Sequence, residues 1–155
     1  MKNATIDLGS LRTRGLERLK PRVPMATVGA GTCGLGNGAG LVLESLEKAM
    51  AAELGAPDAW SLRKVGCFGW CSAEPIAMAY RPGKPLLVFL NVKPAKAPRI
   101  ARGLSSDEAF DKLSKDADAK IESWDFRTSK VDYGSAYPAL KHWNELSFFK
   151  GQEKL

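Results

Sequence analysis

Short apolar runs and one long periodic segment organise the first two thirds of the chain. Strand-length runs occur at residues 25–30, 59–65, 76–80 and 85–92. Between the first two runs, the apolar side chains of residues 39–54 recur near the 3.6-residue spacing of a helix. This order lets the helix cross over between two parallel strands, while the last two runs form a hairpin. The pattern therefore predicts an α/β domain.

Turn and cap residues mark the ends of these predicted elements. We expect Asn37 to cap the start of the 39–54 helix and Gly55 to end it. The Pro-Gly pair of "RPGK" is typical of a hairpin turn. Pro94 suits the first turn of a further short helix after the last strand. Together these signals predict a thioredoxin-like sandwich with a mixed four-stranded sheet over residues 24–104.

Two flanking segments depart from this pattern. Residues 1–23 are a basic leader in which leucines at positions 8, 11, 16 and 19 predict a short helix. Residues 105–155 form a tail that we expect to be helical at first and irregular later. Its helix would begin at a capping box from Ser105 to Glu108 and present one apolar face. That face comprises Phe110, Leu113, Ala117 and Ile121.

Composition is that of a globular protein with one main domain. The chain has 155 residues, of which 45% are hydrophobic, and this is enough for a real core. No apolar run has the length of a transmembrane helix, and the N-terminus lacks the apolar segment of a secretory signal. We therefore expect a cytoplasmic protein without a transmembrane segment.

The net charge of +6 comes largely from the leader and from residues 93–102. A basic chain favours acidic partners, including nucleic acids. However, no predicted helix combines a basic face with interleaved aromatic side chains, and no nucleic-acid-binding motif is present. We interpret the charge as a solvated or subunit-facing surface and expect no nucleic-acid partner.

The stretch "VGAGTCGLGNGAG" contains the G-x-G-x-x-G pattern of dinucleotide-binding loops at Gly29, Gly31 and Gly34. A dinucleotide-binding fold also places an acidic residue near the end of the second strand, where it binds the ribose. Here that strand ends in "RKVGC", which contains no acid. We interpret the glycines instead as a loop that folds tightly around Cys33.

The chain has three cysteines, an odd number that does not make a disulfide framework. Cys33 lies in the glycine-rich loop after the first predicted strand, and Cys67 and Cys71 lie in "GCFGWCSAEP" after the second. Both loops can emerge at the same end of the sheet, where three thiolates would converge. A [2Fe–2S] cluster normally takes four protein ligands. The alternative is that all three are ordinary buried cysteines.

The stretches "TCGLGNGA", "VGCFGWCSAEP" and "LLVFLNVKPAKAPRI" resemble the thioredoxin-like [2Fe–2S] ferredoxin domain. This domain occurs as a small subunit of NADH dehydrogenases and NAD-linked hydrogenases, or fused to the N-terminus of their flavin-carrying, NADH-oxidising subunit. The similarity spans about residues 24–104. The end "SFFKGQEKL" is similar to the start of that subunit's main flavin domain. The resemblance therefore implies that FMN and NAD belong to a following portion or a separate partner.

The resemblance also implies metal ligands at Cys33, Cys67 and Cys71. Cys67 and Cys71 match the family's second ligand pair, and Cys33 matches the second cysteine of its first pair. Val28 stands where the first cysteine of that pair is expected. A fourth ligand would then be an oxygen or nitrogen donor. The nearby candidates are Thr27, Thr32, Asn37 and Glu74.

Two further residues bear on this site. Trp70 lies between Cys67 and Cys71 and would shield a cluster from water, although plain packing explains an aromatic residue there equally well. His142, the only histidine of the chain, lies in the tail, and we interpret it as a surface or packing residue rather than a ligand.

Two functions remain open. The first is an electron-transfer module of an NAD(P)H- and flavin-linked oxidoreductase complex, which carries a [2Fe–2S] cluster and catalyses no reaction on its own. The second is a metal-free docking or assembly module of such a complex. Other subunits or domains of the complex are the expected partners in both.

Overall fold

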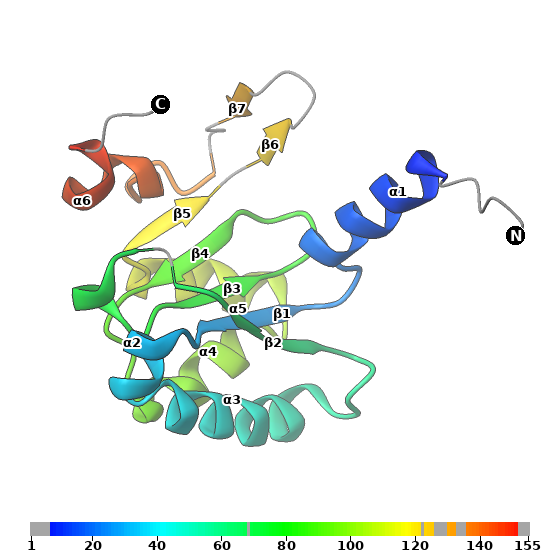
Figure 1. Cartoon of the computed structure of the whole chain (residues 1–155). Helices are drawn as coiled ribbons and strands as arrows, with labels where there is room; N and C mark the ends of the chain where they lie inside the picture. Colours follow the sequence, from blue (N-terminus) through cyan, green and yellow to red (C-terminus); the bar gives the residue numbers. More distant parts are fainter. Residues whose placement is uncertain (1–6, 68, 122, 126–129, 133–135, 152–155) are drawn as a thin grey trace, which may run out of the picture.

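Strands from most of the chain's length join in one mixed sheet in the computed structural model (Figure 1). The structure describes residues 7–67, 69–121, 123–125, 130–132 and 136–151. Within them, the sheet consists of β1 (Met25–Gly29), β2 (Ser61–Val65), β3 (Ala77–Tyr80), β4 (Leu86–Phe89) and β5 (Ala119–Ile121). The order is β2-β1-β3-β4-β5, with β1 and β2 parallel and the other neighbours antiparallel. The mixed α/β fold is confirmed, with one strand more than expected.

Helix α3 (Ala39–Leu54) connects the parallel strands β1 and β2, as the apolar periodicity predicted. A short helix, α2 (Thr32–Gly36), precedes it. Asn37 does not cap α3. It ends α2 instead, and the N-cap of α3 is Gly38 with a φ of 94°. The turn between the two helices needs a left-handed residue, and glycine adopts that conformation without strain.

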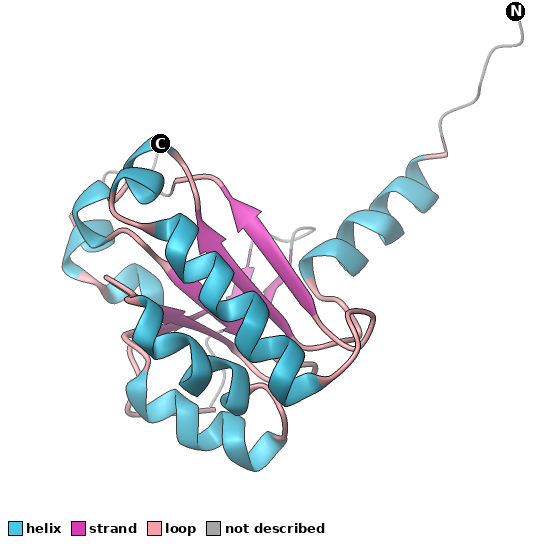
Figure 2. Cartoon of the chain, turned by 90° about the horizontal axis from the view of Figure 1, so that it is seen from below, coloured by secondary structure: helices cyan, strands magenta, loops and turns pink. Residues whose placement is uncertain are grey.

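The two faces of the sheet carry separate apolar clusters. Helices α3 and α4 (Ala97–Gly103) lie on one face (Figures 1 and 2). There, Ala26 and Val28 of β1 pack with the buried residues of both helices. Met78 is paired with Thr27, the residue between them, and therefore belongs to the other face. That face holds a smaller cluster of Ala73, Ile76, Met78, Val88 and Ala119, with Trp143 and Leu146 of the tail packed against it.

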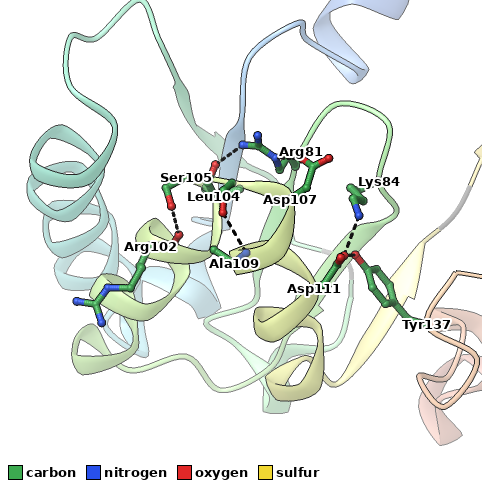
Figure 3. Close-up of polar contacts among 10 residues, drawn as sticks. Arg81, Lys84, Arg102, Leu104, Ser105, Asp107, Ala109, Asp111 and Tyr137 are labelled. Atoms are coloured by element: carbon green, nitrogen blue, oxygen red, sulfur yellow. Dashed lines mark hydrogen bonds and ion pairs between the residues drawn. The ribbon is translucent and has the colours of Figure 1, made fainter.

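Helix α5 (Asp107–Leu113) is tied to the β3–β4 hairpin by ion pairs. Arg81 Nε lies 2.5 Å from Asp107 Oδ1, and Lys84 Nζ lies 2.8 Å from Asp111 Oδ1 (Figure 3). The hydroxyl of Tyr137 donates to the same Asp111 oxygen at 2.5 Å. The bond from Tyr137 also holds a later part of the tail against α5.

The start of α5 differs from the predicted capping box. The N-cap is Ser106, whose hydroxyl accepts a hydrogen bond from the Ala109 N–H at 3.1 Å. Ser105 instead donates its hydroxyl to the Arg102 carbonyl at the end of α4. Two adjacent serines offer the same local signal, so the sequence pattern alone does not choose between them.

The predicted helix of the tail is also too long. The helix ends at Leu113 and is followed by a short 3-10 turn (Ser114–Asp116). Strand β5 then begins at Ala119. Ala117 and Ile121 therefore do not share a helix face with Phe110. Pairing with β4 satisfies the backbone groups of an otherwise open sheet edge, a long-range gain that local periodicity does not report.

The remaining elements lie outside the main sheet. The leader helix α1 (Leu8–Leu19) forms as predicted, has no buried residue, and projects from the body of the chain (Figure 2). The tail adds β6 (Ser123–Asp125), β7 (Lys130–Asp132) and the short helix α6 (Ser147–Lys150). No helix in this described set is long and apolar enough to span a membrane. The first six residues of the leader and residues 152–155 of "SFFKGQEKL" lie outside the described residues.

Candidate metal centre

The two cysteine-bearing loops leave the same end of the sheet. β1 and β2 run parallel, with Gly29 opposite Val65, so the segments that follow them start side by side. The Ala30 N–H donates to the Val65 carbonyl at 2.9 Å and extends this pairing into the loops. A Cβ on Gly31 would lie 3.1 Å from the Cβ of Cys67. The loops are therefore in close contact, and a larger residue at position 31 would push them apart.

Cys67 and Cys71 bring their sulfur atoms together. The two Sγ atoms lie 4.0 Å apart. Two thiolates bound to one tetrahedral ion at about 2.3 Å would lie about 3.8 Å apart, so this pair is spaced for a shared metal. The Gly69 N–H donates to Cys67 Sγ at 3.2 Å. Such amide–sulfur hydrogen bonds tune the potential of iron–sulfur clusters.

Cys33 is half-buried in the first turn of α2 and interacts with this pair through Cys71. The neighbouring Cys33 side chain is the largest influence on Cys71 and raises the pKa of that thiol. The Gly69 N–H acts to lower the pKa of Cys67, but desolvation and the neighbouring Cys71 outweigh it and raise the pKa. Both thiols therefore hold their protons at neutral pH, and metal binding would have to release them.

Val28, at the position where the resemblance places a first cysteine, supplies no donor. Its side chain is fully buried among the residues of α3 and α4. The neighbouring positions Thr27 and Gly29 alternate to the other face of β1. Position 28 therefore belongs to the main apolar core.

Glu74 carries a buried carboxyl beneath the glycine-rich loop. The residue is 3% exposed, and Oε2 accepts the Ile76 N–H at 2.7 Å. Oε1 is buried without a hydrogen-bond partner among the described residues. A Cβ on Gly29 would lie 2.5 Å from Oε2, and one on Gly34 would lie 3.4 Å from it. Gly29 therefore makes room for this carboxyl, whereas Gly34 makes room for the Gly29 carbonyl oxygen, which a Cβ at position 34 would meet at 2.3 Å.

The other candidate fourth ligands have different surroundings. The side-chain amide of Asn37 donates to the Cys71 carbonyl at 3.4 Å and so links α2 to the second cysteine loop. Thr32 is exposed at the start of α2, whereas Thr27 is buried on β1 with no partner for its hydroxyl within the described ranges.

His142 is buried in the tail, where Nδ1 lies 2.9 Å from Asn144 Oδ1 beside a cavity of about 630 Å³. Its position is that of a packing residue.

The three cysteines are only partly brought together in this structure. In the part of the chain that the structure describes, no three or more His, Cys, Asp and Glu side chains are arranged to hold a metal ion. Cys67 and Cys71 form a close thiol pair, with an amide donor to the sulfur of Cys67. Cys33 lies in the first turn of α2, which follows the neighbouring glycine-rich loop.

Sequence reasoning missed three contributors to this region. These are the Gly69 N–H, the buried state of Glu74, and the aromatic side chains of α6 that pack on Trp70. The adjacent phenylalanines in "SFFK" are the only local signal of an apolar contact there, and nothing in the local sequence identifies its partner.

The chain is similar to known proteins only at the level of structure, and only in part. No family model matches the sequence, and no curated protein matches it. Two structures of thioredoxin-like [2Fe–2S] ferredoxin from Aquifex aeolicus are similar in part. One, the wild-type protein, is 15% identical, with a TM-score of 0.41 over 51% of this chain and 82% of that chain. The other is 14% identical, with a TM-score of 0.46 over 66% of this chain and 96% of that chain.

Proposed function

We propose that the chain is an electron-transfer module in which Cys33, Cys67 and Cys71 hold a [2Fe–2S] cluster. The observation that carries this proposal is the placement of all three cysteines on two contacting loops at one end of the β1–β2 pair. When bound, such a cluster supplies one-electron transfer. The module would serve an NAD- and flavin-linked oxidoreductase complex, with FMN and NAD held by another portion or subunit.

The chain's own residues would have three tasks in this function. Gly69 donates its N–H to the Cys67 sulfur and so disperses negative charge on that ligand. Gly31 allows the two loops to approach. Asn37 fixes the backbone of Cys71 through its amide. None of these groups breaks a substrate bond, so the module would not be catalytic on its own.

A metal-free docking or assembly module of the same kind of complex is the second proposal. The observation that favours it is the position of Val28, which lies in the apolar core where a first cysteine ligand was expected. In this case the fold would be retained for its surface, and the three cysteines would remain thiols.

Serine variants of the cysteines distinguish the two proposals. We expect the anaerobically reconstituted chain to absorb in the visible range, and Cys67→Ser or Cys71→Ser to remove most of that absorption because each loses a thiolate ligand. Ser72→Ala, in the same loop, is the matched control and should keep the spectrum. Spectra of both cysteine variants that equal the unsubstituted chain's would contradict the proposed ligands.

A further inference from the structure

The C-terminal helix α6 packs on the cysteine loop through aromatic side chains. The rings of Trp70 and Phe148 are stacked, with centroids 5.0 Å apart and an interplanar angle of 1°. Phe149 meets Trp70 edge-on at 5.7 Å and contacts Trp143 at 4.1 Å. Phe148 and Phe149 also meet edge-on at 4.9 Å. These four rings form one cluster, which we call the aromatic clamp.

Trp70 is the point where the clamp engages the cysteine loop. It lies next to Cys71 and is the N-cap residue of the 3-10 turn that begins at Cys71 (Cys71–Ala73). The Trp70 carbonyl accepts the Ala73 N–H at 3.1 Å, which closes that turn. Its side chain also packs against the smaller apolar cluster of the sheet. The position of Trp70 therefore determines where the Cys71 turn starts.

The two cysteines on either side of Trp70 and Gly69 are not held in place by burial. Cys67 and Cys71 are both exposed, and Gly69 between them has a φ of 84°. Glycine loses more conformational freedom on ordering than any other residue, so this stretch needs external contacts to hold one shape. The aromatic clamp supplies such contacts on the side of Trp70, and the Asn37 amide supplies one at the Cys71 carbonyl.

We infer that the aromatic clamp is a positioning device: Phe148 and Phe149 of α6 hold Trp70, and Trp70 holds Cys67 and Cys71 at the spacing of a bidentate thiol pair. The cluster ligation served by this spacing rests on the proposed function. The positioning itself does not, because it concerns the thiol pair of the metal-free chain. Trp70, Phe148 and Phe149 are positioning residues and are not ligands.

A trivalent arsenical tests this inference without iron. Phenylarsine oxide condenses with two adjacent thiols to form two As–S bonds and release one water, with no change of oxidation state. Its affinity therefore reports how well Cys67 and Cys71 are preorganised. The whole 155-residue chain would be used in a Cys33→Ser background, so that only this pair of cysteines remains. Tryptophan fluorescence or mass spectrometry would follow binding.

We expect Phe148→Ala to weaken arsenical binding about two- to tenfold, the range that corresponds to one aromatic pair. Phe148→Tyr keeps the ring stack and should restore the affinity. Tyr137→Phe is a matched tail variant that removes the bond to Asp111 and leaves the clamp, so its affinity should equal that of the parent. Leu113→Ala creates a cavity in the main core and controls for a general loss of stability.

Equal affinities for Phe148→Ala and its parent would overturn the inference. So would an equal loss in Leu113→Ala, because the effect would then follow global stability rather than the clamp. If Phe148→Ala weakens arsenical binding while the unsubstituted chain assembles no cluster, the positioning role stands and the proposed function fails. If a cluster assembles while the arsenical affinities are equal, the proposed function stands and the clamp does not position the pair.

Discussion

Glu74 shows how single residues shape the glycine-rich loop. Its buried carboxyl has one oxygen satisfied by the Ile76 N–H and one without a partner among the described residues. Burying a carboxyl in this way is unfavourable. The backbone accommodates it because Gly29 has no side chain in the space that the carboxyl fills, and Gly34 lets the Gly29 carbonyl approach closely. Close packing within this chain thus explains why glycines stand at positions of the G-x-G-x-x-G pattern, without a bound dinucleotide.

A cysteine at position 28 tests the missing ligand directly. Because the side chain at this position packs among α3 and α4, we expect Val28→Cys to leave the iron content and EPR spectrum of the reconstituted chain unchanged. The smaller side chain should lower the free energy of unfolding by about 1 kcal/mol. Iron analysis, EPR and urea unfolding measure these effects. Thr32→Cys, on the exposed start of α2, is the comparison variant. A higher iron content or a shifted EPR spectrum in Val28→Cys would contradict the burial argument.

Among the elements, α5 joins the hairpin and the tail through Asp111. Lys84 donates to this carboxylate, as does the hydroxyl of Tyr137 (Figure 3). The hydrogen bond from Lys84 is the largest cause of a lowered pKa for Asp111. Desolvation is the largest cause of the raised pKa of Tyr137, and the hydrogen bond to Asp111 adds to it. Asp111 therefore favours the folded state when it is ionised.

This arrangement predicts a pH-dependent contribution to stability. A carboxyl whose folded pKa is lowered from its ordinary value of 3.8 stabilises the protein above that value, and the stabilisation disappears as the pH falls through the folded pKa. We expect the stability difference between the parent and Asp111→Asn to be constant above about pH 5 and to shrink below about pH 4. Urea unfolding across this range measures it.

The stability difference between the parent and Lys84→Gln should show most of the same pH dependence, because Lys84 is the largest cause of the lowered pKa of Asp111. A parent-to-variant stability difference that stays constant from neutral pH to about pH 3 would show that Asp111 is not stabilised as a carboxylate.

Elements with strong local patterns were predictable, and those defined by distant partners were not. The 39–54 helix and the strands before and after it follow from periodicity and turn residues. β5 was missed because its pairing with β4 is a long-range event. The approach of the two cysteine loops was predictable, since parallel strands send their following loops to one end. The stacking of Trp70 on Phe148 joins distant parts of the chain, and no local pattern reports such a contact.

Across the whole molecule, the core helices α3 and α4 cover a face of the sheet, whereas the cysteines lie at one end of it. α3 and α4 lie together on one face of the sheet, where they form the main core (Figure 1). The cysteines follow the ends of β1 and β2, and the tail packs on Trp70. The stable core is thus separate from the exposed cysteine loop. This division is what the proposed electron-transfer function would require, since a change at the cysteine loop would leave the main core in place.

The most direct test of the central claim is the iron and acid-labile sulfide content of the full chain after anaerobic reconstitution, with an EPR spectrum of the reduced protein. A [2Fe–2S] site predicts about two iron and about two sulfide per chain, and a signal from one unpaired electron after reduction. The triple variant Cys33→Ser, Cys67→Ser, Cys71→Ser should have neither. Iron and sulfide in the unsubstituted, folded chain no higher than in this variant, with no EPR signal, would contradict the account.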